Sequence, residues 1–284
     1  MLMKLGLKTR YNEPFSLPDF TPEMIEIHLA DEDLSQHHRD IIEALSVLDR
    51  IPVVVHTQQN LYSSEERRPL VDPAAQNEKQ REKSIRVIMD TLDLAGEIGA
   101  DYVIIHPGGI TPQPAPDPKP FIQRLNSSLL KIGRDYDTHQ LLLENMPWFY
   151  WMWGEKERWY SNILKFPEEF GELIEPTGVV LDICHAYISV SAGSNEAIHR
   201  FLGILRRQIK HLHLSDAKAP DKEGLQFGEG EIELESVFKE IVDMDVTAIP
   251  EIKGGHLNDR EGFQTAIKRF DEFLRGEGRE NKER

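Results

Sequence analysis

The sequence predicts one α/β domain, a single (β/α)8 barrel of the TIM type, in which the first helix is short or missing. Short apolar runs alternate with charge-rich amphipathic stretches, as expected for parallel strands joined by crossover helices. The chain length of 284 residues also suits one barrel domain. An open doubly wound sheet is the structural alternative.

Eight apolar runs are predicted to form the strands. Several of them are almost continuously apolar, which is typical of strands that are buried on both faces. The predicted strands are residues 2–7, 24–29, 52–56, 102–106, 140–144, 178–182, 209–214 and 247–252.

Helices are predicted between the strands. In residues 79–98, apolar side chains recur at helical spacing, and Gly99 follows as the expected C-cap. Residues 35–49 form another predicted helix, with Ser35 as its N-cap. The remaining predicted helices are residues 119–135, 167–174, 195–207, 234–242 and 260–275.

The two ends of the chain lack a helical pattern. The stretch YNEPFSLPDFTP after the first strand contains three prolines and no helical period, so the first helix is expected to be short or missing. The barrel domain is predicted to span residues 1–275, and residues 276–284 are predicted to form a flexible polar tail.

Composition narrows the classes of function. The net charge of −16 disfavours nucleic acid as a partner, although bound metal ions can reverse the field inside a cleft. No apolar run is long enough for a membrane span, and the N-terminus does not resemble a secretory signal, so we expect a cytoplasmic protein. The single cysteine, Cys184, is expected to be a small buried residue and not a nucleophile.

Most of the predicted strands end in a side chain that can bind a metal ion. In a barrel these ends meet at one mouth, where active sites are built. The candidate metal ligands are His56, His106, Glu144, Asp182, His213 and Glu251.

Taken singly, each of these residues has an ordinary explanation. A histidine after a strand is usually a surface or hydrogen-bonded side chain, and an Asp or Glu there is often a helix N-cap. Taken together they are harder to explain without a cation, because neighbouring buried carboxylates repel one another unless they are protonated or bound to metal.

Three imidazoles and three carboxylates suit Zn, Mn, Fe or Co better than Mg or Ca. We expect a divalent metal cofactor, with Zn or Mn favoured. One ion bound by four of the residues, with the others binding substrate, is one arrangement. Two ions sharing a bridging carboxylate, for which Glu144 is the candidate, is the other.

Six short motifs in order resemble the xylose isomerase-like TIM barrels, which include sugar isomerases, sugar epimerases and endonuclease IV, an enzyme of the AP endonuclease family 2. The resemblance extends from about His56 to Glu251 and covers most of the chain. The motifs are HPGG at 106–109, LLLEN at 141–145, LDICHA at 181–186, HLHLSDAK at 211–218, GEGEI at 228–232 and IPEIK at 249–253.

The resemblance implies roles for individual residues. Glu144, Asp182, His213 and Glu251 match the four-ligand metal site shared by the family. His56 and His106 match two histidines that, in endonuclease IV and some uncharacterised relatives, hold a second metal together with the shared glutamate. The family uses the position of His185 to contact substrate in epimerases and to bind a third metal in the endonuclease.

The sequence departs from the endonuclease pattern at one point. The endonuclease has an Asp-x-His pair that completes its third metal site, whereas this chain has APDKEGLQF, without histidine. Asp221 is the nearest carboxylate, and its spacing does not fit. A three-metal phosphodiesterase is therefore disfavoured.

All four tryptophans lie in residues 148–159, directly after Glu144. This segment is expected to form a lid or wall in which Trp148 and Trp151 stack on the substrate. The alternatives are a contact between subunits of a homo-oligomer or a loop packed on itself.

Several further polar residues lie near the predicted strand ends. Lys218 and Lys253 are candidates for binding a substrate phosphate or carboxylate. Asp216 is expected to orient a histidine ligand. His28 and His211 are expected to be structural, with His211 one layer below His213.

The favoured function is a metal-dependent isomerase or epimerase acting on a carbohydrate, a sugar or sugar phosphate, through an enediolate. Glu144 and Glu251 would serve as base and acid, and His185 would hold a substrate hydroxyl. The first alternative is an endonuclease IV-like phosphodiesterase that cleaves abasic-site DNA or another phosphoester. The second is a metal-loaded binding or regulatory protein without turnover.

Overall fold

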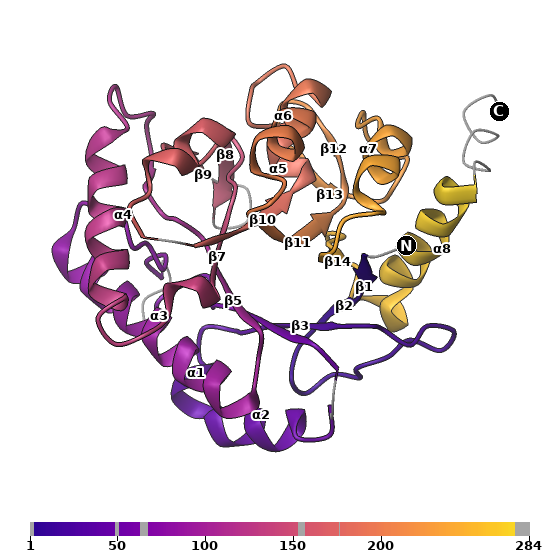
Figure 1. Cartoon of the computed structure of the whole chain (residues 1–284), viewed down its shortest axis with the longest axis horizontal. Helices are drawn as coiled ribbons and strands as arrows, with labels where there is room; N and C mark the ends of the chain where they lie inside the picture. Colours follow the sequence, from indigo (N-terminus) through magenta and orange to yellow (C-terminus); the bar gives the residue numbers. More distant parts are fainter. Residues whose placement is uncertain (1–2, 49–50, 63–67, 153–156, 176, 276–284) are drawn as a thin grey trace.

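A ring of parallel strands occupies the centre of the computed structural model, which describes residues 3–48, 51–62, 68–152, 157–175 and 177–275 (Figure 1). The strands follow one another around the ring in the order β1-β14-β11-β10-β7-β5-β4-β3-β2, and all their pairings are parallel. The bounds are β1 Lys4–Leu5, β2 Leu7–Thr9, β3 Ile25–His28, β4 Val53–His56, β5 Tyr102–Ile105, β7 Leu141–Glu144, β10 Gly178–Asp182, β11 Ile209–Leu214 and β14 Thr247–Pro250. The predicted barrel is confirmed.

The first predicted strand closes the ring because it is divided at Gly6. Its first part, β1, pairs with β14, and its second part, β2, pairs with β3. A Cβ atom on Gly6 would overlap Met24 Sδ and would lie only 2.5 Å from the Met24 carbonyl oxygen. Only glycine therefore lets the chain cross here from one end of the sheet to the other.

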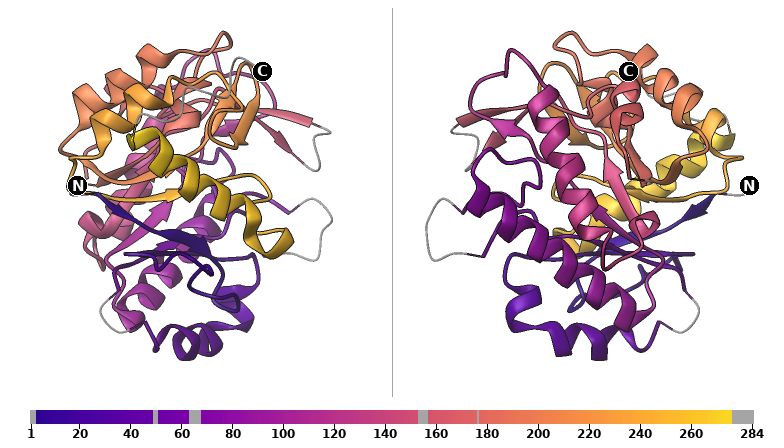
Figure 2. Two further views of the ribbon diagram at one scale, coloured as in Figure 1. Left: turned by 90° about the vertical axis from the view of Figure 1, so that its right-hand side faces the viewer. Right: turned by 60° about the vertical axis from the view of Figure 1, so that its left-hand side comes forward.

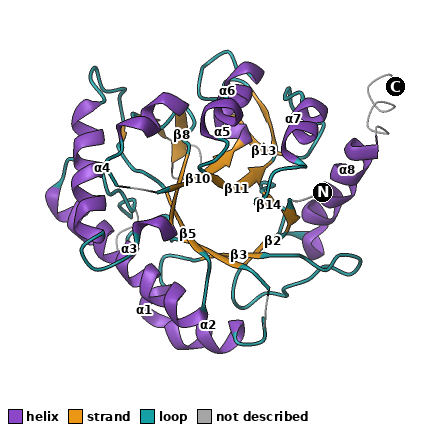
Figure 3. Cartoon of the chain, in the orientation of Figure 1, coloured by secondary structure: helices purple, strands orange, loops and turns teal. Residues whose placement is uncertain are grey.

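Helices cover the outside of the ring (Figure 1, Figure 3). The long helix α3 begins after the N-cap Asn77, whose side chain accepts a hydrogen bond from Gln80 N, and it ends at Gly99 in the left-handed conformation, as predicted. The helices are α1 Asp33–Gln36, α2 His38–Leu45, α3 Glu78–Ile98, α4 Lys119–Ile132, α5 Ile183–Tyr187, α6 Asn195–Leu205, α7 Leu234–Ile241 and α8 Glu261–Arg275. The 3-10 turns are η1 Thr138–Gln140, η2 Pro167–Glu172 and η3 Asn258–Arg260.

The expectations for the first helices hold in part. Residues 10–24, all of them described, contain no helix, as predicted. The predicted helix 35–49 is instead two short helices, α1 and α2, that meet at His37, and Ser35 lies inside α1 and is not an N-cap. The carboxylate of Asp33 accepts a hydrogen bond from Ala30 N at 2.7 Å and so holds the turn that starts α1 earlier than predicted. The predicted helix 167–174 is the 3-10 turn η2.

In the part of the chain that the structure describes, two small antiparallel sheets lie outside the ring. One consists of β6 Ile110–Thr111, β8 Phe149–Met152 and β9 Glu157–Ser161, and the other of β12 Asp216–Lys218 and β13 Lys222–Leu225. Figure 2 shows the β8–β9 hairpin projecting from the body of the barrel. Trp153 and the predicted tail 276–284 lie outside the described residues.

The barrel interior is filled in layers. A small apolar cluster of buried side chains, the apolar plug, closes it below the mouth and is separate from the large core between strands and helices. Side chains two residues apart point to the same face of a strand, so the residue two positions after each member of the plug faces the mouth. The apolar plug consists of Met24, Val54, Ile104, Leu142, Val180 and Ile249.

None of the helices in the described residues is both long enough and apolar enough to cross a membrane.

Candidate metal centre

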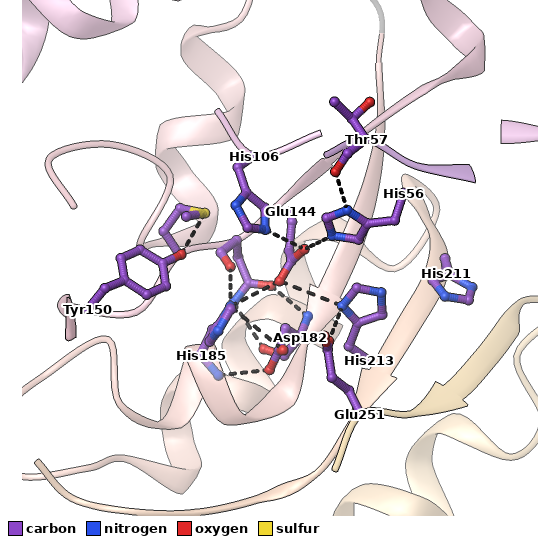
Figure 4. Close-up of polar contacts among 12 residues, drawn as sticks. His56, Thr57, His106, Glu144, Tyr150, Asp182, His185, His211, His213 and Glu251 are labelled. Carbon is purple, nitrogen blue, oxygen red and sulfur yellow. Dashed lines mark hydrogen bonds and ion pairs between the residues drawn. The ribbon is translucent and has the colours of Figure 1, made fainter. Parts of the chain in front are cut away.

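The residues at the mouth of the barrel lie one layer above the apolar plug. Two positions after the apolar plug, the strands carry Glu26, His56, His106, Glu144, Asp182 and Glu251. Strand β11 carries histidine in both layers, His211 level with the plug and His213 above it. Side chains from distant parts of the sequence therefore converge on one point (Figure 4).

A first cluster contains the four residues predicted to form the shared site. One ligand atom each of Glu144, Asp182, His213 and Glu251 lies within 4.8 Å of all the others. His213 Nδ1 is 2.7 Å from Glu251 Oε2 and 3.6 Å from Glu144 Oε1, but it makes no hydrogen bond in the described structure. A buried imidazole nitrogen that faces two carboxylates without a hydrogen bond is suited to hold a cation.

A second cluster joins His56 and His106 to the same glutamate. The Nε2 atoms of His56 and His106 lie 3.4 Å and 3.3 Å from Glu144 Oε2, and that oxygen is buried without a hydrogen bond among the described residues. Ligand atoms of a tetrahedral zinc at about 2.1 Å stand about 3.4 Å apart. His56 Nδ1 faces the backbone oxygen of Thr57 at 2.9 Å, which directs Nε2 toward Glu144. The donor set thus fits one or two divalent ions, with Glu144 common to both clusters.

Burial and neighbouring charges shift the pKa values of the residues at the mouth in different directions. Burial raises the pKa of Asp182 above its usual value. The nearby His185 opposes this rise, and the carboxylates of Glu144 and Glu251 add to it. Burial disfavours a charged His213, but Glu251, Glu26 and Glu144 outweigh it and hold its pKa well above the usual range. For His56, burial dominates and lowers the pKa, which favours the neutral form that binds metal.

His185 is placed by the short helix α5, which starts directly after β10. Asp182 is the N-cap of this helix and accepts a hydrogen bond from His185 N at 2.9 Å, so the N-cap explanation holds for Asp182, which also belongs to the first cluster. His185 Nδ1 lies 3.1 Å from Glu144 Oε1, and its Nε2 lies 3.6 Å from Glu223 Oε2. Glu223, on β13, was not predicted; its signal is a carboxylate in the loop that lacks the Asp-x-His pair.

A cavity of about 370 Å³ opens beside the first cluster. Asp182, His185 and Glu251 line it, and so does the predicted Lys253. Lys218 is exposed on β12 and is not part of the lining. His28, which was expected to be structural, also lines the cavity, and its ring centroid is 5.1 Å from that of His56.

The described part of the tryptophan-rich segment forms strands β8 and β9, and none of Trp148, Trp151 and Trp159 lines this cavity. Trp148 packs against Phe149 and Tyr160, and exposed Trp151 donates a hydrogen bond from Nε1 to Asp221 Oδ2 at 3.0 Å. The residue of this segment that approaches the centre is Tyr150, whose ring stands edge-on to His185 at 6.0 Å between centroids. Burial and the carboxylate of Glu144 raise the pKa of Tyr150 well above its usual value.

Besides Glu223, two further charged residues at the centre were not predicted from the sequence, Lys8 and Glu26. Lys8 Nζ lies 2.5 Å from Glu251 Oε1, and Glu26 Oε2 lies 2.9 Å from Nε2 of both His211 and His213. Their signal was available, because both are charged residues in phase with the mouth positions of apolar strands. The expectation for Asp216 is wrong: its carboxylate accepts backbone hydrogen bonds from the GEGEI loop, and it is Glu26 that contacts Nε2 of the candidate ligand His213.

The fold and the centre together define the class of protein, a metal-dependent enzyme built on a TIM barrel. The family model of the xylose isomerase-like TIM barrel matches residues 20–273, so the chain belongs to that family. An uncharacterized protein of Methanocaldococcus jannaschii is 25% identical over 207 residues, which cover 72% of this chain and 68% of that protein.

Two solved structures illustrate the breadth of the family. A D-tagatose 3-epimerase-like protein superimposes with a TM-score of 0.69 at 23% identity, and the match covers 96% of this chain and 99% of that one. Endonuclease IV from Thermus thermophilus superimposes with a TM-score of 0.64 at 19% identity, with the same two coverages. At these identities the superpositions establish the shared fold and do not choose between the two reactions.

Proposed function

We propose that the protein is a sugar or sugar-phosphate isomerase or epimerase that depends on a divalent metal, with zinc or manganese favoured by the mixture of imidazoles and carboxylates. The observation that carries the proposal is the position of Glu251. Its side chain is 32% exposed, lines the cavity and belongs to the four-residue cluster. A carboxylate that touches both substrate and metal can move a proton at the carbon next to a polarised oxygen.

The cavity supports a small-molecule substrate. Its volume of about 370 Å³ lies within the range usual for small-ligand sites, about 300–1,000 Å³. Polar groups from several strands converge on it, which suits a molecule with several hydroxyls. The D-tagatose 3-epimerase-like neighbour is consistent with such a substrate.

Individual side chains have different roles in the proposed reaction. When bound, the cation supplies polarisation of a substrate carbonyl or hydroxyl oxygen. Glu251 accepts the proton from the neighbouring carbon, and Glu144 is the carboxylate for proton transfer on the opposite face. His185 donates a hydrogen bond to a substrate hydroxyl, and Lys253 binds a phosphate when the substrate carries one. Trp148 and Trp151 would contact a substrate only if it extends beyond the cavity.

Deuterium exchange tests the proposal. Protein loaded with Zn²⁺ or Mn²⁺ is incubated in D2O with a panel of ketoses and ketose phosphates, and incorporation of deuterium next to the carbonyl is followed by NMR. We expect exchange with at least one sugar, its loss in Glu251→Gln, and its retention in Glu196→Gln, the same change at an exposed position. Absence of exchange across the panel in metal-replete protein would overturn the proposal.

The second candidate is an endonuclease IV-like phosphodiesterase, and the His56–His106–Glu144 cluster favours it. That cluster would add a second ion beside the first, and two neighbouring ions can activate a water and bind a phosphate. Incision of a duplex with one abasic site, lost in His106→Ala, is the corresponding assay. If the protein contacts the DNA phosphates, its affinity for this duplex should fall steeply as the salt concentration rises.

A further inference from the structure

Lys8 and Glu26 form a largely buried pair beside the first cluster, and Lys8 also lines the cavity. They are direct partners in the register of β2 and β3, and both side chains point into the barrel. Lys8 Nζ lies 3.2 Å from Glu26 Oε1, and the side chains are 13% and 0% exposed. A buried charged pair of this kind stabilises a fold weakly at best, because removing both charges from water offsets most of their attraction. Its position against two candidate ligands suggests another role.

Glu26 determines which nitrogen of His213 can bind a cation. Glu26 Oε2 is 2.9 Å from His213 Nε2, so this nitrogen carries the proton and donates the hydrogen bond. In the neutral form that binds metal, the lone pair is then on Nδ1, the atom that faces Glu251 and Glu144 and makes no hydrogen bond among the described residues. A carboxylate behind a metal-binding histidine orients the ring and increases its basicity.

Lys8 determines which oxygen of Glu251 faces the cluster. Its ammonium group binds Oε1 at 2.5 Å, and the other oxygen, Oε2, points toward His213 Nδ1 at 2.7 Å. With Oε1 held by Lys8, only Oε2 is available to a cation. Glu251 is thereby restricted to binding through one oxygen.

We propose that Lys8 and Glu26 are positioning residues that together set the coordination geometry of the first cluster, Glu26 by fixing the tautomer of His213 and Lys8 by restricting Glu251 to one ligand oxygen. The inference rests on the proposed metal site but not on the identity of the substrate. It predicts that the pair controls how the ion is coordinated even when no substrate is present.

The simpler explanation is that the pair belongs to a structural network in the barrel. Glu26 also contacts His211 Nε2 at 2.9 Å, and His211 Nδ1 lies 2.6 Å from Thr247 Oγ1. A structural role predicts lower stability after substitution with unchanged coordination. Thr247→Val provides the comparison, because it disturbs this network at His211 without touching His213 or Glu251.

The visible spectrum of bound Co²⁺ separates the two explanations, because it reports coordination number and geometry directly. All variants are made in the His106→Ala background, which disables the second cluster and leaves the first intact. Lys8→Met should shift the spectrum toward higher coordination as Glu251 gains a second ligand oxygen. Lys8→Arg should retain the parent spectrum, as should Lys4→Met, the same change at an exposed neighbour on β1.

Metal affinity provides the second measurement. Glu26→Gln should weaken Zn²⁺ binding about 10–100-fold in competition with a chelator, the range found for partners of metal-binding histidines. Thr247→Val should leave both the affinity and the Co²⁺ spectrum unchanged. An unaltered spectrum in Lys8→Met together with unaltered affinity in Glu26→Gln would overturn the positioning inference and leave the proposed metal site standing. A parent protein that binds neither Co²⁺ nor Zn²⁺ would overturn both the metal site and the inference.

Discussion

Asp72 supports the loop that follows His106, and its buried carboxylate leads to a quantitative prediction. Asp72 Oδ1 accepts hydrogen bonds from Gly109 N at 2.8 Å and Ala74 N at 2.9 Å, and Oδ2 accepts a weaker one from Ile110 N at 3.4 Å. Burial outweighs these bonds and raises the pKa of Asp72 from 3.8 to about 6. Ionisation of Asp72 is therefore less favourable in the folded protein than in the unfolded chain.

The sign and size of the effect follow from linkage. Because the pKa is higher in the folded state, the contribution of Asp72 to stability is fully present below pH 3.8 and is lost as the pH rises through about 6. The complete loss is about 3 kcal/mol, and about 1.4 kcal/mol of it falls between pH 5 and pH 8. Asp72→Asn keeps an acceptor for the two short hydrogen bonds and does not ionise. We expect its stability relative to wild type to rise by about 1.4 kcal/mol over this interval.

Urea unfolding of chelator-treated protein at pH 5 and pH 8 measures this difference without contributions from bound metal. Asp101→Asn, the same change at an exposed position, should show no such pH dependence. An equal difference between Asp72→Asn and wild type at both pH values would refute the reasoning, as would a variant that loses stability relative to wild type as the pH rises.

Three further predictions concern the centre and the barrel. His106→Ala should lower the metal content by the ion of the second cluster while Glu144 keeps its place in the first, and metal analysis after dialysis would contradict this if both ions were lost. A free metal concentration about 100 times the dissociation constant should raise the free energy of unfolding by about 2.7 kcal/mol. A melting temperature that does not change when the metal is removed with a chelator would contradict this prediction. Gly6→Ala should destabilise the barrel by about 1–3 kcal/mol, since its Cβ would meet the backbone oxygen of Met24, and unchanged urea unfolding would argue against the close approach.

The candidate ligands could be predicted from the sequence because they depend on local order. Ile104 and Leu142 belong to the apolar plug, and His106 and Glu144 follow them by two positions. Side chains two positions apart lie on the same face of a strand, so in a parallel barrel the polar side chain lies above the plug. The same rule applied to Met24 also predicts Glu26, which lies inside its strand and not at the strand end. Lys8 was not predicted because the first strand was expected to end at Leu7, whereas β2 extends to Thr9.

The loops could be predicted less well because contacts between distant segments decide them. The aromatic residues 148–160 predicted a lid over the mouth, but pairing of β8 with β9 turns Trp151 outward to Asp221 and leaves Tyr150 beside His185. Similarly, Asp216 has the spacing of a partner for His213, whereas the backbone of the GEGEI loop takes its carboxylate.

The sequence by itself determined the barrel, the order of its strands and the end at which the candidate ligand residues gather, because these follow from the periods of apolar residues and from the common direction of parallel strands. Only the tertiary structure decided which polar groups meet. Register places Lys8 beside Glu26, and the curvature of the sheet brings Glu26 to His213 across the interior, 187 positions away in sequence. Such distances depend on closure of the whole ring, which no local pattern encodes.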